Sequence, residues 1–236
     1  MNKLMNAIGL KSKKAFEEKN DTNSKNKVLN LYAKLLKKEK KSILKENLKD
    51  IKFAKIKGLR ENLVNRLRID EIKLKNIIIS INKISKLKDP VNVTLKKWSR
   101  PNGLIIRRVT IPIGVIGIIF ESRPNVTSDV ASLCFKSGNS VILKGGSEAI
   151  NTNRILVKLF RQALKKNNIN ENYIQLVDTK DRKVVDIMLS KMEKYIDVII
   201  PRGGKSLVKK VQEFSRVPII GHLEGLCHTY VDKDAE

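Results

Sequence analysis

Residues 114–120, GVIGIIF, form a short, continuously apolar run that is followed at once by the polar turn ESRPN at residues 121–125. A run of this kind is typical of a parallel strand that is covered on both faces. It is much too short for a membrane helix, which needs about 20 apolar residues. We therefore expect residues 114–120 to be a central strand of a parallel sheet.

The chain after this strand alternates between apolar strand-like runs and amphipathic segments. A helix capped by Thr127 or Ser128 should end at Ser137-Gly138-Asn139. Further helices are expected at 148–166, 182–192 and 203–214, and further strands at 140–143, 173–177, 197–200, 217–220 and 228–231. This alternation implies right-handed crossovers, so the predicted fold class is α/β with a Rossmann-like, doubly wound parallel sheet.

The chain before residue 113 has a different pattern. Residues 1–88 predict helices, with Ser42 opening one, Asp70 capping another, and apolar side chains at helical spacing at Val28, Leu31, Tyr32, Leu35 and Leu36. Residues 89–112 predict a protruding β-hairpin, with strands at 92–99 and 104–111 around the turn Pro101-Asn102-Gly103. We thus expect an N-terminal helical region at 1–88, a hairpin at 89–112 and a Rossmann-like part at 113–236.

The composition argues against several classes of protein. The 236 residues include 49 Lys and Arg against 24 Asp and Glu, a net charge of +25. Lysine dominates this excess and is spread along the chain, so we expect no specific nucleic-acid partner, although the charge favours anionic ligands. With no secretory signal, no membrane span and no disulfide framework in its two cysteines, the chain is expected to be cytoplasmic.

Two glycine pairs follow expected strands and precede expected helices. The first is Lys144-Gly145-Gly146-Ser147-Glu148, and the second is Arg202-Gly203-Gly204-Lys205-Ser206. Glycines before a helix let backbone N–H groups approach a phosphate, and the lysine and serine add a cation and a hydroxyl. Neither turn has P-loop or G-x-G-x-x-G spacing. Two such turns in one sheet favour a dinucleotide over a lone anion.

The turn Glu121–Asn125 is a third candidate corner. Arg123 suits a carboxylate or phosphate, and the Asn125 amide can donate to a developing oxyanion. The alternative is a strand-to-helix loop with a surface ion pair. If the functional interpretation holds, this turn and both glycine turns should meet at one edge of the sheet, where ligands bind in open parallel sheets.

The cysteines and histidines point to no metal. Cys227 lies between His222 and His228, but no second ligand cluster exists, so a zinc site is not expected. A Cys–His nucleophile would need an oriented base, and we interpret Cys227 as a small residue packed at a strand end. Cys134 lies on an apolar helix face and is expected in the core.

Three segments together resemble the γ-glutamyl phosphate reductase family of the aldehyde dehydrogenase superfamily. They are VTIPIGVIGIIFESRPNVTSDVASLCFKSGNSVILKGGSEAINTN, DVIIPRGGKSLVKKVQ and VPIIGHLEGLCHTYVDKDA, and the resemblance extends over essentially the whole chain. It implies NADPH-dependent reduction of L-glutamyl 5-phosphate to glutamate 5-semialdehyde in proline biosynthesis, through a cysteine thioester. It also implies a homo-oligomer built through the hairpin. An ordinary aldehyde dehydrogenase is the alternative within the enzyme class, and the ESRPN and PRGG turns argue against it.

The resemblance also implies roles for residues. Lys144, Gly145, Gly146, Ser147, Glu148, Gly203 and Gly204 would hold NADPH or NADP, and Ser122, Arg123 and Asn125 would face the substrate, with Asn125 as oxyanion donor. The family's nucleophilic cysteine lies in a segment after CHxYVD, whereas this sequence ends at Glu236. We therefore expect no reductase activity from this chain alone. It would then be an inactive nucleotide-binding relic or need a separate catalytic fragment.

Overall fold

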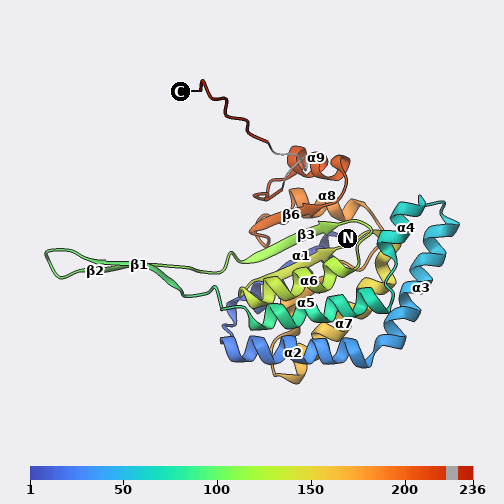
Figure 1. Cartoon of the computed structure of the whole chain (residues 1–236), viewed down its shortest axis with the longest axis horizontal. Helices are drawn as coiled ribbons and strands as arrows, with labels where there is room; N and C mark the ends of the chain where they lie inside the picture. Colours follow the sequence, from blue (N-terminus) through green and yellow to red (C-terminus); the bar gives the residue numbers. More distant parts are fainter. Residues whose placement is uncertain (222–227, 236) are drawn as a thin grey trace.

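A four-stranded parallel sheet forms the centre of the molecule, which we describe from a computed structural model of residues 1–221 and 228–235. The strand order is β5-β4-β3-β6. The strands are β3 (Val115–Phe120), β4 (Ser140–Lys144), β5 (Ile174–Leu176) and β6 (Val198–Arg202). The predicted α/β class and the central place of residues 114–120 are therefore confirmed (Figure 1).

The side chains of β3 alternate between two hydrophobic cores. Ile116, Ile118 and Phe120 pack in the larger core, whereas Val115 and Ile119 pack in the other. All six residues of the strand are buried. Because successive strand residues point to opposite faces, a strand covered on both faces must be apolar throughout, which explains the uninterrupted run in the sequence.

Helices cover both faces of this sheet, as a doubly wound fold requires (Figure 1). The larger core receives side chains from α2 (Thr22–Lys38), α5 (Glu71–Lys86), α6 (Asn125–Lys136) and α7 (Ile150–Lys166). The opposite core receives them from α1 (Asn2–Glu17), α8 (Lys183–Ser190) and α9 (Lys205–Phe214). Two further helices, α3 (Lys40–Ile56) and α4 (Glu61–Leu67), form a small third cluster near the start of α7.

Some helix boundaries follow the predicted caps and others do not. Asp70 caps α5 by accepting the N–H of Lys73, and Gly138 ends α6 with a φ of 75°, both as predicted. Thr127 and Ser128 were wrong as caps, because α6 already begins at Asn125. Both are buried inside the helix, where their hydroxyls bond to other helices instead. Ser42 was also wrong as a start, because α3 begins at Lys40.

The strands predicted at 217–220 and 228–231 are not present in the structure. Residues 217–220 make only one parallel bridge to β6, between Ile219 and Ile199. Residues 228–231 form no strand, and Tyr230 and Val231 are largely exposed in a segment that points away from the sheet (Figure 1). A strand needs a neighbour for its N–H and C=O groups, and this segment lies beside none. Residues 222–227, including His222 and Cys227, lie outside the described residues.

The predicted hairpin is confirmed as β1 (Thr94–Ser99) and β2 (Ile105–Val109), which pair antiparallel. Gly103 closes the turn with a φ of 83° and donates to Arg100 O at 3.0 Å. The hairpin extends away from the body, and all its strand residues are exposed except the half-buried Ile106 (Figure 1). Its apolar side chains are therefore unpartnered within the described chain.

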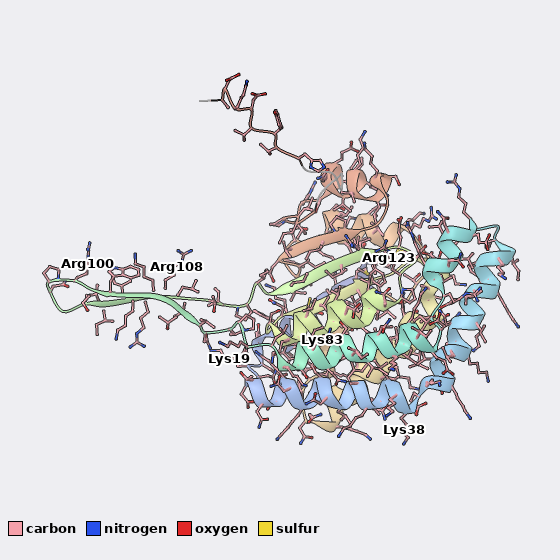
Figure 2. The ribbon with its side chains drawn as sticks, in the orientation of Figure 1. Lys19, Lys38, Lys83, Arg100, Arg108 and Arg123 are labelled. Carbon is pink, nitrogen blue, oxygen red and sulfur yellow. The ribbon has the colours of Figure 1, made fainter. Side chains whose placement is uncertain are left out.

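Positively charged side chains lie on several elements of the fold. Lys38 and Lys83 lie on helices, whereas Arg100 and Arg108 lie on the hairpin (Figure 2). Over the described residues, no helix combines the length and the apolar character needed to cross a bilayer.

Candidate functional site

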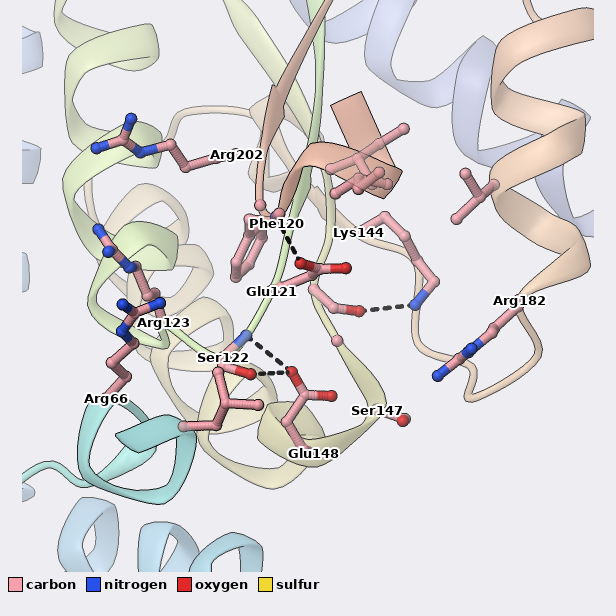
Figure 3. Close-up of a pocket in the computed structure, with 18 of the residues that line it drawn as sticks. Arg66, Phe120, Glu121, Ser122, Arg123, Lys144, Ser147, Glu148, Arg182 and Arg202 are labelled. Atoms are coloured by element: carbon pink, nitrogen blue, oxygen red, sulfur yellow. Dashed lines mark hydrogen bonds between the residues drawn. The ribbon is translucent and has the colours of Figure 1, made fainter. Parts of the chain in front are cut away.

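A cavity of about 960 Å³ opens at the carboxyl ends of β3, β4 and β6. Each strand contributes the turn that follows it: Glu121–Arg123 from β3, Lys144–Glu148 from β4 and Arg202–Gly204 from β6. The three turns singled out in the sequence therefore meet around one space, as the parallel topology requires (Figure 3). Asn125 is the exception, because it does not line the cavity.

The lining is strongly cationic. Eight basic side chains and two acidic ones line the cavity; the basic ones are Lys57, Arg66, Arg123, Lys144, Lys180, Arg182, Arg202 and Lys210. A concave wall lined mainly by one sign of charge concentrates ligands of the opposite sign. The cavity is thus suited to a ligand with several negative charges.

Several of these cations were missed by reasoning from the sequence. Lys180 and Arg182 follow β5, so the rule that identified the other turns would have found them. Lys57 and Arg66 come from the α3–α4 region, which no local pattern connects to the sheet. The structure shows that the α3–α4 region contacts the residues after β5: Lys180 Nζ lies 4.5 Å from the ring centroid of Phe53 on α3.

The turn after β3 is held by a carboxylate from the turn after β4. Glu148 Oε1 accepts the Ser122 backbone N–H at 2.7 Å and the Ser122 hydroxyl at 2.8 Å (Figure 3). Ser122 has a φ of 41°, a left-handed conformation that is uncommon for residues other than glycine. The two bonds therefore stabilise a strained turn and fix the position from which Arg123 enters the cavity.

A second carboxylate occupies the start of α9. Glu121 Oε2 accepts the Gly204 backbone N–H at 2.9 Å, directly before the first residue of that helix. Helix N-termini favour negative charge, because their first N–H groups lack partners within the helix. Glu121 thus lies where an anionic ligand group would bind, and such a ligand has to take its place.

The start of α7 is stabilised by a carboxylate from α3, a helix about 100 positions earlier in the chain. The buried Asp50 on α3 accepts the backbone N–H groups of Asn151 and Thr152, at 3.2 and 2.8 Å. It also accepts the Asn151 side-chain amide and the Thr152 hydroxyl. These donors are therefore committed to the protein, and a phosphate at the first glycine pair has to use Lys144, Ser147 and the turn itself.

Lys144 is the most enclosed cation of the cavity, with 6% of its surface exposed. Its Nζ donates to Gly145 O at 2.7 Å, which leaves two further N–H donors for a ligand. Burial lowers the pKa of Lys144 below its ordinary value; the charge of Glu148 opposes this shift and that of Arg182 adds to it. A bound anion would offset both the cost of burying the positive charge of Lys144 and the repulsion by Arg182.

The two glycine turns differ in whether the structure has room for a side chain. A Cβ on Gly145 would lie 2.2 Å from Asn153 Nδ2 and 3.0 Å from the Phe120 ring, so the fold excludes any side chain there. A Cβ on Gly204 would meet nothing nearer than Glu121 at 3.8 Å. The fold does not require glycine at 204, where the missing side chain instead keeps the cavity wall open.

Of the three residues predicted to face a substrate, two line the cavity and one does not. Arg123 and Ser122 line the cavity together with Arg66, and Figure 3 shows Arg66 and Arg123 on the same side of it. Asn125 is exposed in the first turn of α6, and its amide donates to Asp129 Oδ2 at 3.2 Å. Its role as an oxyanion donor stays a prediction, and in this structure that amide is committed to Asp129.

No thiol or metal cluster is found at the cavity among the described residues. Cys134 is buried in the core as predicted, and burial raises the pKa of its thiol to about 12. A thiol in that state is a poor nucleophile. The described ranges also contain no group of three or more His, Cys, Asp or Glu placed to hold a metal ion. Cys227 lies outside those ranges, so its predicted packing stays untested.

Comparison with known proteins gives consistent results. No family model matches the chain. The gamma-glutamyl phosphate reductase of Sulfurihydrogenibium sp. is 46% identical over 215 residues, which are 91% of this chain and 48% of that protein. The enzyme of the same name from Clostridium tetani is 44% identical over 237 residues, covering 100% of this chain and 55% of its own length. The chain thus spans about half the length of the curated relatives it matches.

Solved structures give the same result for the fold. A crystal structure of gamma-glutamyl phosphate reductase from Thermotoga maritima superposes with a TM-score of 0.87 at 37% identity, over 90% of this chain and 52% of that one. A propionaldehyde dehydrogenase from Clostridium phytofermentans, 20% identical, has a TM-score of 0.68 over 92% of this chain and 46% of its own and shares the fold. In sequence and in fold, the chain is therefore similar to gamma-glutamyl phosphate reductases over about half the length of those enzymes.

Proposed function

We propose that this chain forms the cofactor-binding part of a reductase that converts L-glutamyl 5-phosphate to L-glutamate 5-semialdehyde and phosphate, using NADPH. One observation carries the proposal: two glycine turns and eight cationic side chains meet in one cavity, in a chain whose relatives bear that enzyme's name. The reaction belongs to proline biosynthesis, and a cytoplasmic location is part of the same proposal.

The residues around the cavity fit a phosphorylated dinucleotide. A pyrophosphate would replace Glu121 as the acceptor of the Gly204 N–H at the N-terminus of α9, and the open wall at Gly204 would let it approach. Lys144 and Ser147 lie at the end of β4 and in the turn after it, within the same cavity. When bound, NADPH would supply the hydride, and these residues would bind and orient it.

Arg123 and Arg66 suit the substrate end of the cavity. A guanidinium group makes paired hydrogen bonds to a carboxylate or phosphate, and glutamyl phosphate carries both. Glu148 would position Ser122, and with it Arg123, through the two hydrogen bonds at 2.7 and 2.8 Å. The buried Cys134 cannot act as the nucleophile, so we assign that role to no described residue.

The hairpin suits contact with a second subunit. Its exposed apolar side chains include Val93, Leu95, Trp98, Leu104, Ile105 and Val109. Unpaired strand edges with apolar side chains favour pairing with another chain. We infer that the hairpin is an oligomerisation arm, which light scattering of the chain with and without residues 92–111 would test.

NADPH binding tests the proposal directly. Titration of the purified chain, followed by NADPH fluorescence, should show saturable binding that 5′-AMP displaces. Gly204→Phe should weaken binding, because a ring there would fill the open wall of the cavity. Ser99→Phe, which adds the same ring on the exposed strand β1, is the matched control and should bind normally. Absence of binding, or equal effects of both substitutions, would refute the proposal.

A further inference from the structure

A carboxylate at the root of the hairpin lies between two buried lysines. Asp89 follows the end of α5 and precedes β1. Lys25 on α2 and Lys136 at the end of α6 are 3% and 2% exposed. Lys25 Nζ donates to Asp89 Oδ2 at 2.9 Å, and the charge of Asp89 opposes the repulsion of Lys136 by Lys25. We call these three residues the root triad.

Asp89 also holds the first residues of the hairpin. Its Oδ1 accepts the Val91 backbone N–H at 3.0 Å, and its Oδ2 accepts the Thr22 hydroxyl at 2.8 Å. Burial raises the pKa of Asp89, but the hydrogen bonds from Lys25, Val91 and Thr22 lower it by more, so that the pKa lies below its ordinary value. A charged carboxylate thus ties the start of the hairpin to the start of α2.

The second strand of the hairpin is joined to the first at the same place. The Asn92 N–H donates to Thr110 O at 2.9 Å. Both strands also pack against Gly138, which follows α6, because a Cβ there would lie 3.0 Å from Pro112 and 3.3 Å from Val91. Whatever holds the first strand at the root therefore holds the second strand as well.

Beyond the root, the described part of the body makes no hydrogen bond or ion pair to residues 94–109. The strand residues there are exposed except the half-buried Ile106, and their hydrogen bonds join only the two strands and their turn. The direction in which the hairpin leaves the body (Figure 1) therefore depends on its root.

We propose that Asp89, held between Lys25 and Lys136, fixes the direction of the hairpin, so that the arm is presented to a second subunit in one orientation. The second subunit rests on the proposed oligomerisation arm, whereas the fixed direction does not. A buried ion pair stabilises little more than apolar packing would, but breaking it is costly. Its charged hydrogen bonds need one geometry, unlike apolar contacts, which are non-directional. An arm fixed before binding also loses less freedom when it pairs.

Time-resolved fluorescence anisotropy of Trp98 tests the inference, because Trp98 is the only tryptophan of the chain and lies on β1. In the unsubstituted chain, diluted until light scattering gives the mass of a monomer, its anisotropy should decay with the tumbling of the whole molecule, apart from side-chain motion. Asp89→Ala should add a decay on the nanosecond timescale, as the hairpin moves about its root. Asp178→Ala is the control: it removes the carboxylate of an exposed ion pair with Arg154, outside the root, and should add none.

A second variant separates direction from stability. Asp89→Ala leaves two buried lysines without a counter-charge and should lower the urea midpoint of unfolding. Lys25→Met combined with Asp89→Ala removes both charges of the pair, so the midpoint should recover, while the Val91 N–H still lacks its acceptor. The double variant should therefore keep the added decay. If it loses that decay, or if Asp89→Ala folds and shows none, Asp89 acts on stability alone and the inference fails.

The outcomes also separate this inference from the proposed oligomerisation arm. If the unsubstituted chain already shows the added decay, the hairpin is not fixed at its root and the inference fails, whatever the chain's oligomeric state. If the Asp89 variants show the added decay but associate in light scattering as the unsubstituted chain does, the fixed direction stands and its role in assembly fails. Added decay together with weaker association supports both.

Discussion

Replacing Gly145 by alanine should destabilise the protein, although it adds one methyl group. The new Cβ would lie 2.2 Å from Asn153 Nδ2 and 3.0 Å from the Phe120 ring. Asn153 cannot move freely, because it is buried and its Oδ1 accepts the buried Thr127 hydroxyl at 2.8 Å. The methyl group therefore forces either the amide or the aromatic ring out of place.

The size of the effect follows from these contacts. Loss of a buried hydrogen bond with an unsatisfied partner costs about 1–3 kcal/mol. Overpacking a close-packed core costs a further 1–3 kcal/mol or so. We expect Gly145→Ala to lower the free energy of unfolding by roughly 2–6 kcal/mol, a large part of the stability of a typical domain.

Gly204→Ala is the matched control within the same cavity. Its Cβ meets only Glu121 at 3.8 Å, and the backbone there, with φ −70° and ψ 166°, suits any residue. Its free energy of unfolding should change by less than about 1 kcal/mol. Urea denaturation followed by circular dichroism measures both variants. Equal stability of the two, or a larger loss for Gly204→Ala, would refute this account of the glycines.

Three further predictions follow from buried groups. Asp50→Ala should lower the free energy of unfolding by about 3 kcal/mol or more, because the part-buried N–H of Asn151 and the buried N–H of Thr152 lose their acceptor; urea denaturation measures it, and a loss below about 1 kcal/mol would contradict it. In a Cys227→Ser background, Cys134 should resist iodoacetamide until the chain unfolds, because burial raises the pKa of its thiol to about 12; rapid labelling of the folded chain would contradict this. Because burial lowers the pKa of Lys144, its charged form is lost as pH rises through a value below the ordinary 10.5. Affinity for NADPH should therefore start to fall before pH 10.5, and a profile that stays flat up to that pH would contradict it.

Local sequence patterns were sufficient for the four strands of the sheet and the turns after them, although they also predicted two strands, 217–220 and 228–231, that are not formed. The apolar run at residues 114–120 implied a strand buried on both faces, because side chains alternate along a strand. Glycines at 145 and 146 and at 203 and 204, each pair after such a strand, implied turns at one edge of the sheet. Asp70 and Gly138 marked helix ends for equally local reasons, since caps act within one helical turn.

Other features of the site depend on residues that are far apart in the chain. Asp50 satisfies the start of α7 across about 100 positions, and Glu121 reaches the start of α9. Thr127 and Ser128 resembled caps, but their hydroxyls bond to Asn153 and Tyr32 in other helices. No window of sequence contains both partners, so such contacts cannot be read from local patterns.

The sequence by itself determined the parallel sheet, the hairpin and the three turns, because strand and turn preferences act between near neighbours. The tertiary structure alone decided which charges share the cavity. It brings Arg66 and Lys57 from the α3–α4 region to the turns that follow the strands, and it places Arg182 in the same cavity as Lys144. Electrostatic interaction depends on distance in space, and the packing of helices against the sheet sets that distance.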